Sequence, residues 1–156
     1  MAEHDCLNEL EGDWRGPSNL WLNPAEPPIP SEWTASVTKV ADGQFLAISY
    51  AWEFNEARKE GVLTFGLNGD AEKAGATWLD SWHMANQIMV CDRRMRDDGS
   101  VAMLGGYAAP PGPDWGWRIE IHPGEDADSF VLKMFNITPE GEEAPAVQTD
   151  FRREGS

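Results

Sequence analysis

Regular alternation of apolar and polar residues, interrupted at short intervals by turn-forming residues, constrains the fold of this chain more than any other feature. In the segment 45–54, every second position is large and apolar or aromatic: Leu46, Ile48, Tyr50, Trp52 and Phe54. A period of two is typical of a strand with one buried face, and such strands build antiparallel sheets that are wet on the other side. The sequence therefore predicts an all-β protein.

Turn chemistry divides the chain into strand-sized pieces. Asp42-Gly43, Asn68-Gly69 and Asp98-Gly99 are dipeptides suited to tight hairpins, because Gly and Asn tolerate positive φ. The runs between breaks are about 7–11 residues long, a normal strand length. The expected strands are Asp13–Leu22, Glu32–Val40, Phe45–Phe54, Glu60–Leu67, Ala76–His83, Gln87–Met95, Ser100–Ala108, Asp114–His122, Ser129–Ile137 and Pro145–Arg153.

These runs predict a single domain over residues 1–156, with about ten strands and short connections. An open sheet would leave two unpaired edges, whereas closure into a barrel removes them. We therefore expect a closed antiparallel up-and-down barrel, wide enough to enclose a cavity. The segment Asp5–Gly12 is the one expected helix, short and placed to cap one end of the barrel.

The charge of the chain limits its partners. Twelve Lys and Arg against 27 Asp and Glu give a net charge of −15, which repels the phosphates of nucleic acids and anionic lipid headgroups. Nucleic acid and membrane partners are therefore not expected. The start Met1–Cys6 has neither the basic residues nor the apolar run of a secretory signal, so a cytoplasmic location is expected. Cys6 and Cys91 match no metal or redox spacing, and no metal site is predicted.

Four stretches carry a resemblance to a known family: 10–16 (LEGDWRG), 80–84 (DSWHM), 110–118 (PPGPDWGWR) and 134–143 (MFNITPEGEE). In order and wording they resemble the bacterial family of domain of unknown function 1579, over nearly the whole chain. That family resembles the calycin group of lipocalins, fatty-acid-binding proteins and nitrobindins. The resemblance implies a lipocalin-like barrel with an internal ligand cavity, and it implies no activity.

The segment 80–83 (DSWH) is the main candidate for chemistry. Strand alternation over Ala76–His83 would place Asp80 and Trp82 on one face and His83 on the other, so that Asp80 and His83 form no direct pair. If the Trp face is inward, desolvation should raise the pKa of Asp80, making it a general acid or a polar anchor for a ligand. If the other face is inward, Ser81 and His83 line the cavity instead. A separate alternative is that Asp80 accepts a hydrogen bond from a turn amide or pairs with an Arg. A haem, as in nitrobindins, would need His83 as its axial ligand.

Other alternating positions complete the predicted ligand-binding surface: Tyr50, Trp52, Tyr107, Trp117, Met134 and Asn136. Apolar walls with a few polar groups are the normal composition of a small-molecule pocket. Arg118 follows Trp117 directly and should point the other way. It is expected to form a salt bridge with Asp114, Glu120 or Asp150, or else, if inward, to bind a ligand carboxylate.

Three functions are compatible with these patterns. The favoured one is a carrier or sensor that binds a small, largely apolar molecule inside the barrel. The second is an enzyme that uses Asp80 or His83 for proton transfer. The third is an interaction module with a filled barrel, and association as a homodimer is compatible with any of them. None of the phosphate-binding, nucleophile or metal motifs that would indicate another enzyme class is present in the sequence.

Overall fold

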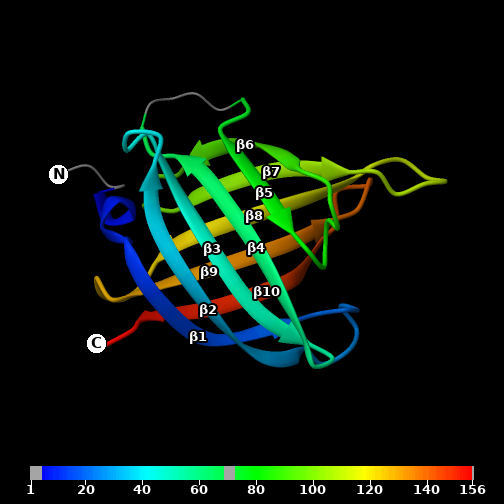
Figure 1. Cartoon of the computed structure of the whole chain (residues 1–156). Helices are drawn as coiled ribbons and strands as arrows, with labels where there is room; N and C mark the ends of the chain where they lie inside the picture. Colours follow the sequence, from blue (N-terminus) through cyan, green and yellow to red (C-terminus); the bar gives the residue numbers. More distant parts are fainter. Residues whose placement is uncertain (1–4, 69–72, 156) are drawn as a thin grey trace.

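Ten strands close into one antiparallel barrel, in which each strand pairs with its neighbours in sequence and β1 pairs with β10 (Figure 1). The computed structural model describes residues 5–68 and 73–155. The strands are β1 Gly12–Leu20, β2 Ile29–Val40, β3 Phe45–Phe54, β4 Ala57–Gly66, β5 Ala76–Asp80, β6 Met89–Met95, β7 Val101–Tyr107, β8 Trp115–Pro123, β9 Ser129–Ile137 and β10 Glu143–Arg153. The predicted fold class, a closed up-and-down barrel, is confirmed.

Several strand ends differ from the prediction. β4 begins at Ala57 rather than at Glu60, because the β3–β4 turn consists only of Asn55 and Glu56, both with positive φ (50° and 64°). The sequence indicates a break over Glu56–Glu60, but Glu is uncommon in this conformation, so it does not indicate a turn of only two residues that begins at Asn55. The turn at Asp42-Gly43 and that at Asp98-Gly99 lie where expected, whereas the one expected at Asn68-Gly69 lies partly outside the described residues.

The expected N-terminal helix over Asp5–Gly12 is a shorter 3-10 turn, η1, over Asp5–Glu9. Leu7 of this turn and Leu10, which comes directly after it, are buried in the core. The indole N–H of Trp14 donates to the Leu10 carbonyl at 2.8 Å. The Arg153 guanidinium lies 4.4 Å from the Trp14 ring centroid. This turn closes the end of the barrel on the left in Figure 1.

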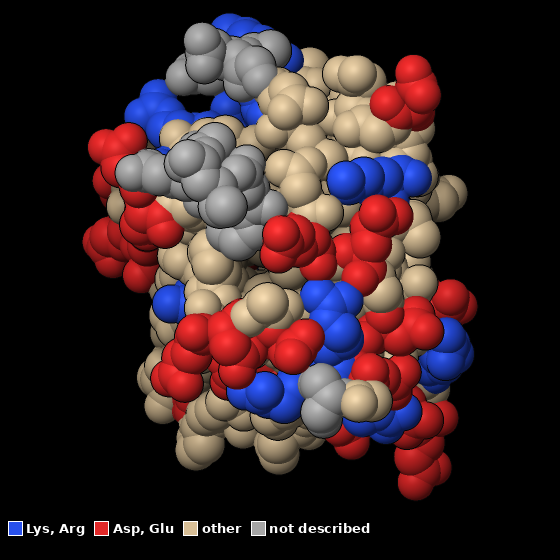
Figure 2. All heavy atoms as spheres, turned by 90° about the vertical axis from the view of Figure 1, so that its left-hand side faces the viewer, with Lys and Arg blue, Asp and Glu red and all other residues tan. Residues whose placement is uncertain are grey.

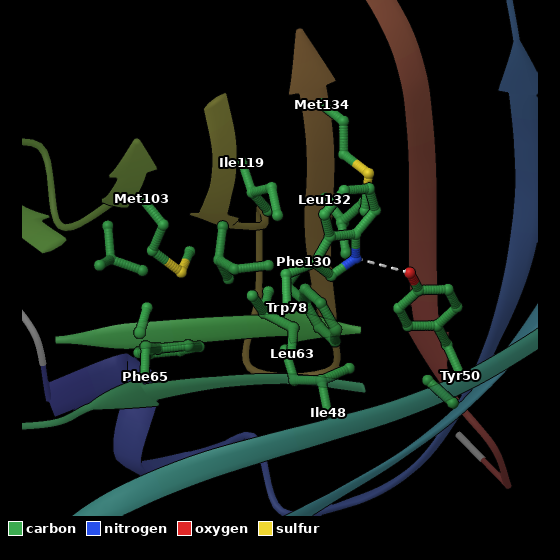
Figure 3. Close-up of a cluster of buried hydrophobic side chains, with 14 of the residues drawn as sticks. Ile48, Tyr50, Leu63, Phe65, Trp78, Met103, Ile119, Phe130, Leu132 and Met134 are labelled. Carbon is green, nitrogen blue, oxygen red and sulfur yellow. Dashed lines mark hydrogen bonds between the residues drawn. The ribbon is translucent and has the colours of Figure 1, made fainter. Parts of the chain in front are cut away.

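Side chains fill the middle of the barrel (Figure 3). Ile119, Leu132 and Met134 have 0% exposed surface, and aromatic rings pack toward the closed end, with the centroids of Phe130 and Phe151 4.9 Å apart. The expectation of a cavity along the barrel axis is therefore wrong for the middle of the barrel, where these side chains lie. A sheet of ten strands is wide, but large side chains on its inner face occupy that width.

The outer surface carries most of the charge. Figure 2, which faces the closed end, shows acidic side chains spread over this face with basic ones between them. No helix among residues 5–68 and 73–155 has the length and apolar character needed to span a bilayer.

Candidate functional site

Aromatic side chains, together with Met84 and Asn136, gather where β3, β7 and β9 end and β8 begins. In Figure 1 these strand ends lie on the right, opposite η1. The side chains come from the last residues of β3, β7 and β9, the first residues of β8 and the turn that follows β5. We call this set the mouth; it consists of Trp52, Phe54, Trp82, His83, Met84, Tyr107, Trp117 and Asn136. Most members of the mouth are half-buried, in contrast to the fully buried middle of the barrel.

A row of residues across three strands supports the mouth. Tyr50 of β3 pairs with Gly61 of β4, which pairs with Asp80 of β5. Because Gly61 has no side chain, the Tyr50 ring lies across it, where a Cβ atom would overlap the ring. The Tyr50 hydroxyl donates to Asp80 Oδ2 at 2.6 Å. It accepts a hydrogen bond from the Trp78 indole at 2.9 Å (Figure 3). Tyr50, which we predicted to line a pocket, thus forms a structural bridge.

Asp80 ends β5 and holds the turn over residues 81–86. Its Oδ1 accepts the backbone N–H groups of Trp82 and His83, both at 2.8 Å, and its carbonyl accepts the N–H of Met84 at 2.9 Å. The His83 Nδ1 lies 3.2 Å from the same Oδ1. The prediction that a strand continues to His83 and separates it from Asp80 is therefore wrong. A carboxylate that binds amides two and three residues ahead bends the chain instead.

The Asp80 carboxylate is ionised at neutral pH. Burial by itself raises its pKa, but hydrogen bonding and charge interaction with His83, and then hydrogen bonding with Tyr50, together bring the pKa below the ordinary 3.8. The predicted upward shift is wrong, because these interactions outweigh desolvation. The alternative interpretation, an Asp bonded to turn amides, is confirmed. With both oxygens engaged, Asp80 is not suited to act as a general acid, so the enzyme hypothesis depends on His83.

Four indole rings surround the imidazole of His83 and form an aromatic box. Ring centroids lie 4.6 Å away for Trp82, 5.2 Å for Trp117, 5.4 Å for Trp78 and 6.1 Å for Trp52. The His83 side chain is only 11% exposed. These rings occupy the space that a haem plane would need, so the arrangement does not fit a haem on His83. Among the described residues, no group of His, Cys, Asp and Glu is arranged to hold a metal ion.

Two indole N–H groups of the box have no hydrogen-bond partner among the residues that the structure describes. They belong to Trp52 and Trp117, which are only 3% and 6% exposed. In contrast, Trp14 and Trp78 donate to protein oxygens. Buried donors are normally satisfied, so each exception in a native structure needs an explanation. The sequence placed both tryptophans inside but gave no sign that their N–H groups would lack partners.

The remaining predicted residues lie at different depths. The Tyr107 hydroxyl donates to Asn136 Oδ1 at 2.5 Å, so these two half-buried side chains satisfy each other at the rim. Met134 is fully buried below the mouth.

Cys91 is a buried free thiol whose pKa is raised to about 12 by burial and the charge of Asp92. It is therefore not a nucleophile at neutral pH.

Arg118 points outward, as its alternation with Trp117 predicted. Its Nε donates to Glu120 at 2.7 Å, and its two terminal nitrogens donate to Glu143 at 2.8 and 2.6 Å. The predicted salt bridge with Glu120 is confirmed, and Glu143 is an additional partner. Burial raises the pKa of Glu120, but hydrogen bonds from His122 and Arg118 outweigh it and lower the pKa to about 2. The Arg118 guanidinium is therefore bound to two carboxylates on the outer surface and does not point into the barrel.

A groove of about 760 Å³ lies beside the mouth. Trp52 and Phe54 of the mouth line it, together with the exposed apolar side chains of Leu22 (54%) and Ile29 (38%). Charged side chains complete its wall: Arg15, Glu32, Glu53, Glu56 and Arg58. Its volume lies within the range of about 300–1,000 Å³ typical of small-molecule sites. Of the predicted lining residues only Trp52 belongs to this groove, because most of its wall comes from outward positions of β1, β2 and β3, such as Arg15, Glu32 and Glu53, together with the β3–β4 turn.

Solved structures with the same fold include proteins of different kinds. An S-type phycobiliprotein lyase, CPES from Guillardia theta, has a TM-score of 0.66 and 17% identity, covering 100% of this chain and 94% of that one. Rv2717c from M. tuberculosis has a TM-score of 0.57 and 13% identity over 99% and 98% of the two chains. A DUF3598 family protein from Nostoc punctiforme has a TM-score of 0.55 and 14% identity over 94% and 48%. At these identities the likeness shows the fold alone.

Sequence comparison assigns the family. No curated protein matches the chain. The model of a family described as a protein of unknown function, DUF1579, matches residues 1–153, which include all four stretches that carried the resemblance and every residue of the mouth. This protein therefore belongs to the DUF1579 family.

Proposed function

We propose that this protein is a carrier or sensor that binds a small, largely apolar molecule at its mouth. The observation that carries the proposal is the groove of about 760 Å³ whose wall includes Trp52 and Phe54. The sequence suggested a binding site on the barrel axis. The site proposed here lies instead at the end of the barrel, beside the groove.

The chemistry of the wall supports an apolar ligand. Trp52 and Phe54 contact Trp82 of the mouth, with ring centroids 5.7 and 5.2 Å away. Leu22 and Ile29 leave apolar surface exposed on the same groove. Exposed apolar side chains flanked by charged groups are often found at binding sites. A ligand that covers it would gain about 25 cal/mol for each Å² of apolar surface removed from water.

Titration with N-phenyl-1-naphthylamine, an uncharged apolar fluorescent probe, tests this proposal. We expect saturable binding at one site and an affinity about five- to tenfold weaker in Phe54→Ala, because the variant removes part of the apolar wall. Leu104→Ala is the matched control, since Leu104 is also a large exposed apolar residue (51%) but lies on β7 outside the groove. Absence of saturable binding, or equal losses in both variants, would contradict the proposal.

A further inference from the structure

The two unpartnered indole N–H groups of the mouth indicate what kind of ligand it takes. Trp52 and Trp117 border the same imidazole, with ring centroids 6.1 and 5.2 Å from that of His83. An indole N–H is a donor only, so a partner for it must be a hydrogen-bond acceptor. Leaving two such donors buried costs free energy that a ligand with an acceptor would recover.

The walls of the box favour a flat molecule. Trp117 stacks on Trp78 at 5.2 Å with an angle of 10° between the ring planes, and Trp52 stacks on Trp33 at 5.5 Å and 18°. Near-parallel rings present flat faces, against which another planar ring packs closely. The imidazole of His83, itself a flat ring, already occupies the space among these indoles.

Charge at the same place limits the ligand further. The Asp80 carboxylate is buried and ionised beside the imidazole, with the His83 Nδ1 3.2 Å from its Oδ1. A second negative charge brought into this box would be repelled at low dielectric. Arg118, which follows Trp117 in sequence, binds Glu120 and Glu143 on the outer surface and does not face the box.

We propose that the mouth recognises a planar, uncharged aromatic molecule bearing a hydrogen-bond acceptor, whose ring replaces the imidazole of His83 and whose acceptor takes the indole N–H of Trp52 or Trp117. This inference rests on the proposed small-molecule binding and adds the chemical class of the ligand. The turn over residues 81–86 carries His83, so ligand entry moves this turn outward while the apolar part of the ligand lies along the groove that Trp52 shares.

Three naphthalene probes test separately the need for a hydrogen-bond acceptor and the exclusion of a negative charge. These are 2-acetylnaphthalene, which carries a neutral acceptor, 2-isopropylnaphthalene, which has the same shape without it, and 2-naphthoate, which is anionic. By calorimetric titration at pH 7 we expect the acetyl compound to bind about fivefold more tightly than the isopropyl compound, the effect of one hydrogen bond. We expect naphthoate to bind at least about tenfold more weakly than the acetyl compound.

Variants then assign the contacts. Trp52→Phe and Trp117→Phe retain a flat ring but remove the donor, so at least one of them should reduce the preference for the acetyl over the isopropyl compound to below about twofold. Trp21→Phe, a change at a half-buried tryptophan just beyond β1, is the control and should leave the preference intact. His83→Ala, which empties the box, should bind the acetyl compound more tightly.

The outcomes distinguish the two proposals. If none of the three probes binds the wild-type protein, small-molecule binding at the mouth is refuted together with the ligand class. If the isopropyl compound or naphthoate binds as tightly as the acetyl compound, the ligand class is wrong while the proposed function stands. A preference that neither Trp52→Phe nor Trp117→Phe reduces, or weaker binding by His83→Ala, likewise overturns the ligand class alone.

Discussion

Gly61 shows how one small residue sets the geometry of the mouth. It lies between Tyr50 and Asp80 in the register of β3, β4 and β5, and its missing side chain lets the Tyr50 hydroxyl reach the carboxylate. Sequence alternation placed Tyr50 on an inner face and left open which face of the strand that contains Asp80 points inward. It could not show that Tyr50 and Asp80 meet, because contact between them depends on the register of three strands, which a single sequence does not fix.

Gly61→Ala should destabilise the protein by about 1–3 kcal/mol, the usual cost of forcing extra atoms into a packed interior. The added Cβ would overlap the Tyr50 ring. Gly66→Ala in the same strand is the control, because its Cβ would meet no atom closer than 3.8 Å and the substitution should change stability by less than about 1 kcal/mol. Urea unfolding measures both, and equal effects would disprove the bridging role of Tyr50.

Asp80 should make the free energy of unfolding depend on pH. A carboxyl whose folded-state pKa is lowered below its unfolded value contributes stability that is fully present above the unfolded pKa of about 3.9 and is lost as pH falls through the folded pKa. Because the pKa of Asp80 is lowered, the free energy of unfolding should fall less steeply below about pH 4 in Asp80→Asn than in the wild type. Asp42→Asn, in the exposed β2–β3 turn, should retain the wild-type slope. An unchanged slope in Asp80→Asn would refute the assignment.

At the scale of elements, alternation predicted where strands lie better than where they end. Turns built on Asp-Gly dipeptides carry a local signal, and those at 42–43 and 98–99 were found as expected. The turn over residues 81–86 has Ser81 and Asn86 at its ends, but the residues between them, Trp82 to Ala85, are not turn-forming. Its cause is the Asp80 side chain, which accepts the amides that would otherwise continue β5.

This explanation predicts local protection of the turn. In hydrogen exchange measured by NMR, the amides of Trp82 and His83 should be protected in the wild type, because both donate to Asp80 Oδ1. Asp80→Ala should accelerate exchange of these two amides at least about tenfold, as expected for the loss of charge-assisted bonds. The amide of Leu104 on β7, away from the turn, serves as reference. Similar acceleration there would indicate global unfolding and contradict a local effect.

For the whole molecule, the sequence was sufficient to predict a closed ten-stranded antiparallel barrel, because repeated one-sided strands leave few alternatives that avoid open edges. It was not sufficient to predict how the barrel is filled. That depends on which rotamers the large side chains adopt, and here they fill the middle of the barrel, while the groove of about 760 Å³ lies beside the mouth. Association as a homodimer stays a prediction from the sequence.

Because side chains fill the middle of the barrel, we expect substitutions there to cost more stability than substitutions at the mouth. Met134→Ala should destabilise the protein by about 2–5 kcal/mol, because it creates a void among close-packed side chains. Met84→Ala is the comparison, since Met84 lies half-buried in the turn at the mouth, and it should cost about 1 kcal/mol or less. Thermal and urea unfolding give both values. Equally small costs would indicate that Met134 borders an open cavity.

A crystal structure of the protein in complex with N-phenyl-1-naphthylamine would locate the binding site itself. We expect electron density for the probe at the mouth, against Trp52 and Phe54, with the middle of the barrel packed as in the free protein. Density for the probe among Ile119, Leu132 and Met134, or on the outer surface away from the mouth, would contradict it.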